Sequence, residues 1–138
     1  MDNNNSNCIK LRVTSPEGIQ YEANIRSLHI KSIDGELTIL PKHFPLLTNV
    51  VISICHFIED NKVVEAYVGD GIMHVSENMI ELIVEAFTLK NDIDIERARK
   101  AKERAEERLN SLDPSIDKIR AHKALVRAEA RISLWEKK

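Results

Sequence analysis

Residues 93–109, IDIERARKAKERAEERL, and residues 116–138, IDKIRAHKALVRAEARISLWEKK, contain neither glycine nor proline. Alanine and charged residues recur in both stretches at spacings of three and four, as they do in amphipathic helices. All four glycines lie before residue 72, in a part that is rich in Val, Ile and Thr. The change at Asn91 therefore predicts a β-rich unit over residues 1–90 and a helical unit over residues 91–138.

The β-rich part consists of short apolar runs that turn residues separate. The expected strands cover residues 9–13, 19–21, 25–30, 37–40, 50–58, 63–68, 72–75 and 80–86. Strands that recur about every 8–12 residues, with turns between them, are typical of an antiparallel β-sandwich or flattened barrel. No segment has the pattern of a crossover helix, so we do not expect a parallel sheet.

The helical part carries start signals for two helices. Asn91 or Asp92 is the expected N-cap of the first helix, and Asp113 is the expected N-cap of the second, with Pro114 at its first position. Because the connection is short, we expect the helices to run antiparallel as a hairpin. The chain as a whole is predicted to be α+β, with an N-terminal sandwich and a C-terminal helix hairpin.

Small side chains form the predicted contact face between the helices. They are Ala98, Ala101, Ala105, Leu109 and Leu112 on the first helix, and Ala121, Ala124, Leu125, Ala128, Ile132 and Trp135 on the second. Alanine lets two helices approach closely, but it forgoes about 0.8 kcal/mol for each CH₂ that leucine would bury. We therefore expect a modestly held hairpin that can detach or extend.

The net charge of −2 conceals an asymmetry between the two parts. Residues 92–138 carry 13 Lys/Arg and 10 Asp/Glu, whereas residues 1–91 carry 7 and 12. A protein dedicated to duplex nucleic acid would be basic overall, so the composition argues against that class. It suits an arm that binds an acidic partner or a phosphate.

The sequence shows no sign of membrane insertion or export. No apolar run approaches the ~20 residues of a membrane span, and the first residues, MDNNNSN, lack the features of a signal or transit peptide. We expect a frayed leader there and a protein that acts where it is made. Cys8 and Cys55 have no partner spacing and are expected to be free thiols.

Arginine recurs with one spacing, +7 and +4, in both helices. The two rows are Arg97, Arg104 and Arg108, and Arg120, Arg127 and Arg131. In an antiparallel pair, these rows should converge along one edge of the hairpin. Two interpretations stay open: a solvated basic face that neighbouring acids partly neutralise, or a site for a phosphate-bearing ligand or an acidic partner helix.

No pattern typical of catalysis or metal binding is present. The Gly69-Asp70-Gly71 stretch lacks both the GK[ST] signature and the following helix of a phosphate loop. The five histidines form neither HxH nor HExxH, and no nucleophile elbow or acid–base pair is visible. We expect a non-catalytic protein that needs neither a metal nor a cofactor.

Residues 35–48, GELTILPKHFPLLT, resemble the GE…LP-x-H-x-P block of the epsilon subunit of F-type ATP synthases, bacterial type. Residues 67–75, YVGDGIMHV, residues 78–82, NMIEL, and the hairpin continue the resemblance, which runs from about residue 9 to residue 135. Lys42 and Asp70 stand where glycine is common. The resemblance implies a sandwich that docks on the gamma subunit and on the membrane rotor ring.

The resemblance also implies regulation by the hairpin. It can rise along the central shaft and inhibit ATP hydrolysis, where its arginines would meet acidic segments of the catalytic beta subunits. Some bacterial members bind ATP on the folded hairpin through an (I/L)-D-x-x-R-A motif. By resemblance, the ATP-binding residues here are Ile93, Asp94, Arg97 and Ala98, with Arg127 and Arg131 on the second helix. Thr88 replaces an acid that some ATP-binding relatives carry nearby.

Two functions are compared. The first is a non-catalytic rotor subunit of a proton-translocating ATP synthase, peripheral on the cytoplasmic side of the cell membrane, with ATP as a regulatory ligand and no nucleic acid partner. The alternative is a β-sandwich adaptor whose basic arm binds an acidic protein or RNA outside any ATPase.

Overall fold

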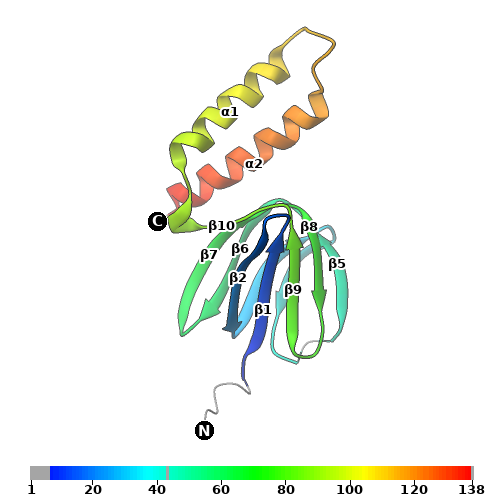
Figure 1. Ribbon diagram of the computed structural model, residues 1–138, viewed down its shortest axis with the longest axis vertical. Coiled ribbons are helices and arrows are strands. Elements are labelled where there is room, and N and C mark those ends of the chain that lie inside the picture. Colours follow the sequence, from blue (N-terminus) through cyan, green and yellow to red (C-terminus); the bar gives the residue numbers. More distant parts are fainter. Residues whose placement is uncertain (1–6, 43, 138) are drawn as a thin grey trace.

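In the computed structural model, strands make up the front of the chain and two long helices its end (Figure 1). The structure describes residues 7–42 and 44–137, so the first six of the seven residues of the predicted leader and His43 of the sequence motif lie outside the described residues. The strands are β1 (Ile9–Ser15), β2 (Gly18–Ile25), β3 (Ser27–Ser32), β4 (Gly35–Ile39), β5 (Leu46–Val50), β6 (Ser53–Glu59), β7 (Lys62–Val68), β8 (Gly71–Val75), β9 (Met79–Val84) and β10 (Phe87–Leu89). The 3-10 helix η2 (Lys90–Asp92) and the helices α1 (Ile95–Asn110) and α2 (Lys118–Glu136) follow. The predicted α+β class is confirmed.

The strands are hydrogen-bonded in the order β10-β7-β6-β3-β5-β8-β9-β1-β2, and β4 pairs with β3. Neighbouring strands are antiparallel except β1 and β9, which run parallel with Leu11 beside Ile80. One parallel pair thus lies within a sheet whose other described pairs are antiparallel, so the predicted antiparallel sandwich is confirmed. No crossover helix is needed there, because the seven strands between β1 and β9 supply the return path.

Alternating side chains of the strands fill one apolar core. In β1, Ile9, Leu11 and Val13 point inward, and the residues between them are partly exposed. The sandwich closes where β2 packs over β6: the ring of Tyr21 lies 5.5 Å from that of Phe57, and the Tyr21 hydroxyl donates to Glu59. This core lies within the β-unit, so it does not depend on the helices.

The strands predicted from the sequence differ from those of the structure at two places. The expected strand over residues 50–58 is divided between β5 and β6, and β10 was not predicted at all. At the division, Val51 donates its N–H to the Lys31 carbonyl and the Ser53 hydroxyl donates to the Val51 carbonyl. The partner of the Val51 N–H lies 20 positions away on β3, and such a long-range contact leaves no local signal in the sequence.

Both helices begin a few residues later than expected. Asp94 caps α1 by accepting the Arg97 N–H at 3.1 Å, and Asp117 caps α2 by accepting the Arg120 N–H at 3.1 Å. The expected caps Asn91, Asp92 and Asp113 were wrong. Asn91 and Asp92 belong to η2, while the Asp113 side chain accepts from Ser115 in the turn before α2.

The two caps belong to one repeated sequence, Ile-Asp-x-x-Arg-Ala, at residues 93–98 and again at residues 116–121. In both copies the aspartate is the N-cap and the alanine is buried against the other helix. The motif is therefore in the first place a helix-start motif, and a functional role needs further support from its surroundings.

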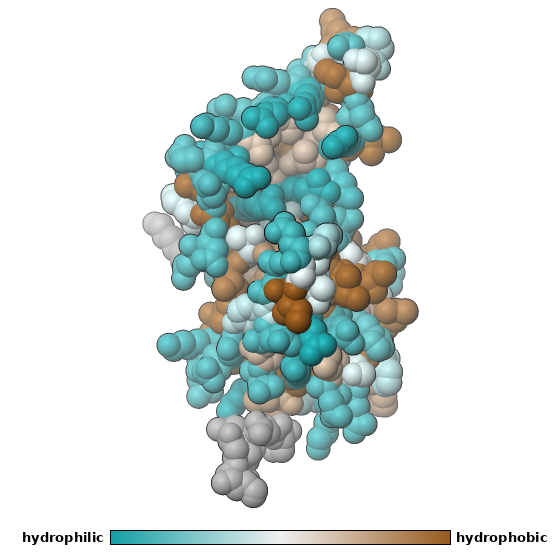
Figure 2. Space-filling view, viewed as in Figure 1, coloured by the Kyte–Doolittle hydropathy of each residue, from teal (hydrophilic) through white to brown (hydrophobic). Residues whose placement is uncertain are grey.

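The helices form the expected antiparallel hairpin, which projects from one end of the sandwich (Figure 1). Ala98, Ala105, Ala121 and Ala128 are buried between them. Figure 2 shows that the outer surface of the hairpin is mostly hydrophilic. One assignment to the seam was wrong, because Leu112 is 98% exposed. Trp135 is 43% exposed, but it does contact the other helix: the guanidinium carbon of Arg99 on α1 lies 5.4 Å from its ring centroid.

Gly71 tests how tightly β8 and β9 approach each other. A Cβ on Gly71 would lie 2.1 Å from the Ile83 carbonyl oxygen and 2.7 Å from the Val84 Cα, so the backbone would have to shift. We expect Gly71→Ala to lower the free energy of unfolding by about 2–3 kcal/mol in urea denaturation. Gly18→Ala is the control: it has free space at a φ of +109°, and we expect about 1–2 kcal/mol. Equal losses in the two variants would contradict the close approach.

Candidate functional site

A pocket of about 400 Å³ lies where the hairpin meets the sandwich. Its wall comes from the β1–β2 turn, the chain between β9 and α1, the first turns of α1 and the end of α2. The lining residues are Ser15, Glu17, Gln20, Glu85, Ala86, Phe87, Thr88, Asp92, Ile93, Asp94, Arg97, Ala98, Ala101 and Arg131. Five of the six predicted site residues are among them, and the sixth, Arg127, contacts the lining residue Glu85.

In the first copy of the Ile-Asp-x-x-Arg-Ala motif, three of the four fixed residues stabilise the fold, by packing or by helix capping. Ile93 is 8% exposed and packs with the sandwich, Asp94 caps α1, and Ala98 is 4% exposed against α2. Arg97 differs, because its side chain is exposed, lines the pocket, and has no acidic partner among the described residues. The guanidinium of Arg97 is thus available to an anion.

Arg131 is held by an aromatic ring. Its guanidinium carbon lies 4.2 Å from the centroid of Tyr67, a residue that is fully buried on β7. Burial raises the pKa of Tyr67, so the ring stays neutral beneath the cation. A guanidinium that lies over a ring directs its N–H donors sideways, and no described carboxylate pairs with Arg131. The stack therefore positions a second unpaired cation at the pocket.

Arg127, in contrast, has a carboxylate partner. Its Nη2 lies 2.7 Å from Oε2 of Glu85, and its side chain is 27% exposed. Its Nε–H is buried and has no hydrogen-bond acceptor among the described residues. The structure therefore brings together Arg97 and Arg131, as the row hypothesis requires, but it places Arg127 behind Glu85. Arg104, Arg108 and Arg120 are exposed and do not line the pocket.

A small second core fixes both ends of the hairpin to the sandwich. It consists of Tyr67 on β7, Ile93 before α1 and Leu134 near the end of α2. Leu134 is fully buried, although the sequence did not assign it to any contact face. The pocket exists because this cluster holds the start of α1 and the end of α2 against the same edge of the sheet.

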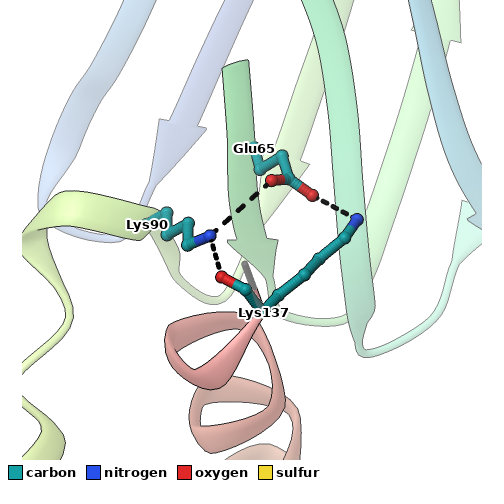
Figure 3. Close-up of polar contacts among 3 residues, drawn as sticks. All are labelled: Glu65, Lys90 and Lys137. Carbon is teal, nitrogen blue, oxygen red and sulfur yellow. Dashed lines mark hydrogen bonds and ion pairs between the residues drawn. The ribbon is translucent and has the colours of Figure 1, made fainter. Parts of the chain in front are cut away.

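Ion pairs surround this small core. Figure 3 shows Glu65 of β7 between two lysines: Lys137 Nζ lies 2.5 Å and Lys90 Nζ 4.0 Å from its carboxylate oxygens, and Lys90 also donates to the Lys137 carbonyl. Further along α2, Lys123 lies 2.9 Å from Asp70, and this hydrogen bond lowers the pKa of Asp70. Each partly exposed pair contributes about 0–1 kcal/mol. The docked hairpin is thus held by several weak ion pairs in addition to the buried cluster.

Several lining residues could not have been found from the sequence. Ser15, Glu17 and Gln20 come from the β1–β2 hairpin, about 75 to 80 residues before α1. The ion-pair partner of Glu85, Arg127, lies 42 positions away in the chain. No described histidine, cysteine or acid belongs to a cluster of three that could hold a metal ion. Within the described part of the chain, no helix combines the length and apolarity needed to cross a membrane.

Two family models match the chain in succession. Residues 8–90 match "ATP synthase, Delta/Epsilon chain, beta-sandwich domain", and residues 91–136 match "ATP synthase, Delta/Epsilon chain, long alpha-helix domain". The chain is 38% identical over 125 residues to the ATP synthase epsilon chain of Natranaerobius thermophilus, covering 89% of each protein. It is 33% identical over 124 residues to that of Nitratidesulfovibrio vulgaris, covering 90% of this chain and 92% of the relative.

A solved structure shares the fold. It is a chain of the Euglena gracilis mitochondrial ATP synthase, determined as OSCP/F1/c-ring in rotational state 1. The TM-score is 0.76 at 20% identity, over 90% of this chain and 79% of the other. At this identity, the likeness supports the architecture alone.

The matched models account for residues 8–136, and the relatives exceed 30% identity over most of both chains. The chain therefore belongs to the ATP synthase delta/epsilon family, as an epsilon chain, which is a non-catalytic subunit of ATP synthase.

Proposed function

We propose that this epsilon chain is a regulatory rotor subunit of a proton-translocating ATP synthase, in which residues 1–90 hold the rotor and residues 91–138 respond to ATP. One observation carries the ATP part of the proposal. Of two identical helix-start motifs, the copy in α1 lines a pocket together with Arg131, whereas Arg120 of the copy in α2 is exposed away from it. The copy in α1 is therefore a candidate ligand site, whereas the copy in α2 caps its helix but does not line the pocket.

The groups around the pocket fit a nucleotide. Arg97 and Arg131 offer N–H donors that suit phosphate oxygens. Carboxylates such as Asp92 can accept hydrogen bonds from ribose hydroxyls, and Phe87 and Ala101 provide apolar surface for a base. The volume of about 400 Å³ is within the range of about 300–1,000 Å³ that is typical of small-molecule sites.

The site exists only while the hairpin is docked, because the sandwich, α1 and α2 all contribute to it. A ligand that binds the docked form alone stabilises that form by mass action. We propose that ATP keeps the hairpin folded, and that the extended hairpin inhibits ATP hydrolysis by placing its arginines against acidic segments of the beta subunits. No cofactor is required for either state.

The outer face of β5, β8 and β9 is the proposed surface for the gamma subunit. Leu47, Ile72 and Ile83 are 70%, 45% and 52% exposed there, and Ile72 is paired with Ile83. Figure 2 shows hydrophobic residues on the sandwich below the hairpin, as expected of a surface that a partner covers. We further propose contact with the membrane rotor ring and a peripheral position on the cytoplasmic side of the cell membrane. An adaptor outside any ATPase has no comparable support.

Arg97→Ala tests the nucleotide site. We expect ATP to bind about tenfold or more weakly to this variant in titration calorimetry, because a charge-assisted hydrogen bond is lost. Arg120→Ala is the matched control, since it removes the same residue from the same position of the second motif, and its affinity should equal that of the wild type. Equal ATP affinity in all three proteins would show that Arg97 is not a ligand.

Glu65→Gln tests how the hairpin is held. The substitution keeps the shape of the side chain but removes the charge that faces Lys90 and Lys137. We expect backbone amides of α2 to exchange with solvent faster, corresponding to a loss of about 0.5–1.5 kcal/mol in docking free energy. Trp135, the single tryptophan, should report the change by its fluorescence.

Glu81→Gln is the control, since Glu81 lies on β9 opposite His74 and has no ion pair with the part of the hairpin that the structure describes. Exchange that is equally fast in both variants would mean that a general loss of charge, rather than the contact with Glu65, is responsible.

Deletion of residues 92–138 tests regulation in the assembled enzyme. The core of the sandwich does not include the helices, so we expect the truncated subunit to assemble and ATP hydrolysis by the purified complex to rise. Loss of the subunit from the complex would contradict the proposal that residues 1–90 suffice for binding to the rotor. An unchanged rate of ATP hydrolysis with the truncated subunit in place would contradict the proposal that the hairpin inhibits hydrolysis.

A further inference from the structure

Glu85 on the sandwich forms an ion pair with Arg127 on α2 beside the pocket. Glu85 lines the pocket, whereas Arg127 does not. Arg127 Nη2 lies 2.7 Å from Glu85 Oε2, so the two side chains form a close ion pair. The cation is thus held back from the pocket by a carboxylate that faces it.

Carboxylate and phosphate oxygens compete for the same donors. A guanidinium presents a planar fork of N–H groups, and either anion can engage it. The pocket is also rich in acid, since Glu17, Glu85, Asp92 and Asp94 line it beside only two arginines. Asp94 is committed to the cap of α1, whereas Glu85 is paired with a cation that a phosphate could use instead.

We propose that Glu85 is an internal competitor that sets the affinity of the site for the phosphates of its ligand. Without a nucleotide, Glu85 holds Arg127 and so ties α2 to the sandwich. When a nucleotide binds, a phosphate takes the place of the Glu85 carboxylate on Arg127. The ligand, instead of the ion pair, then connects α2 to the sandwich. This inference rests on the nucleotide site proposed above. In it, Arg127 binds Glu85 when the site is empty and a phosphate when a nucleotide is bound.

The chain offers a matched control for the effect on docking. Lys123 and Asp70 form a second ion pair between α2 and the sandwich, at 2.9 Å, and neither residue lines the pocket. The two acids have the same side-chain exposure, 41%. Asp70→Asn therefore removes a second tie between α2 and the sandwich but keeps the carboxylate of Glu85. The backbone carbonyl at position 70 can still accept from the Glu85 N–H in this variant, as the Asp70 carbonyl does at 3.0 Å.

The experiment is titration calorimetry of the full chain with ATP and, separately, with adenosine, at one ionic strength. We expect Glu85→Gln to bind ATP about three- to tenfold more tightly than Asp70→Asn does, because the competing charge is gone. Adenosine lacks phosphates, so its affinity should be the same in the two variants. A role of Glu85 in folding or docking alone would shift both ligands together.

Each outcome has a definite meaning. If wild type binds ATP, but Glu85→Gln binds it no more tightly than Asp70→Asn, the competition is refuted and the nucleotide site stands. If adenosine gains as much affinity as ATP, the competition for phosphate is also refuted. If only Glu85→Gln binds ATP, the competition is supported and the site is closed to ATP in the wild type. If no variant binds ATP, both the site and the inference are refuted.

Discussion

The burial of Leu134 with Tyr67 is the contact on which the arrangement of this protein depends. It holds the end of α2 against β7, and Ile93 completes the same cluster at the start of α1. Because both ends of the hairpin are fixed at one edge of the sheet, Arg97 and Arg131 come to face one pocket although they are 34 positions apart in the chain. The ring of Tyr67 then serves a second purpose, since it carries the guanidinium of Arg131.

The forces that hold the hairpin are individually small. Its seam consists largely of alanine, which buries little area, and its ties to the sandwich are partly exposed ion pairs worth about 0–1 kcal/mol each. A ligand at 100 times its Kd adds about 2.7 kcal/mol to the form that binds it. Such a ligand is therefore comparable in free energy to several of these ion pairs together, while the buried cluster of Tyr67, Ile93 and Leu134 contributes in addition.

The sequence predicted the class of structure well and its local details less well. The change of residue composition at Asn91 indicated strands followed by a hairpin, and periodicity located most strands. The helix starts were misplaced by a few residues, because acids at Asp92 and Asp113 look as suitable for capping as the true caps, Asp94 and Asp117. Only the pairing of backbone groups decides between neighbouring aspartates.

The residues of the candidate site could be predicted from the sequence only in part. The sequence pointed to Arg97 and Arg131, and the structure places both at the pocket. It did not point to Glu85 or Tyr67, since their partners lie on α2, about 40 to 65 positions away.

What the sequence alone determined is therefore the succession of elements and the small residues of the seam, because periodicity and composition act over a few neighbouring residues. The tertiary structure decided which of two identical Ile-Asp-x-x-Arg-Ala motifs faces a pocket and which arginine is paired with an acid. The reason is that burial and ion pairing depend on distances in space, and only the docking of α2 on the sandwich fixes those distances.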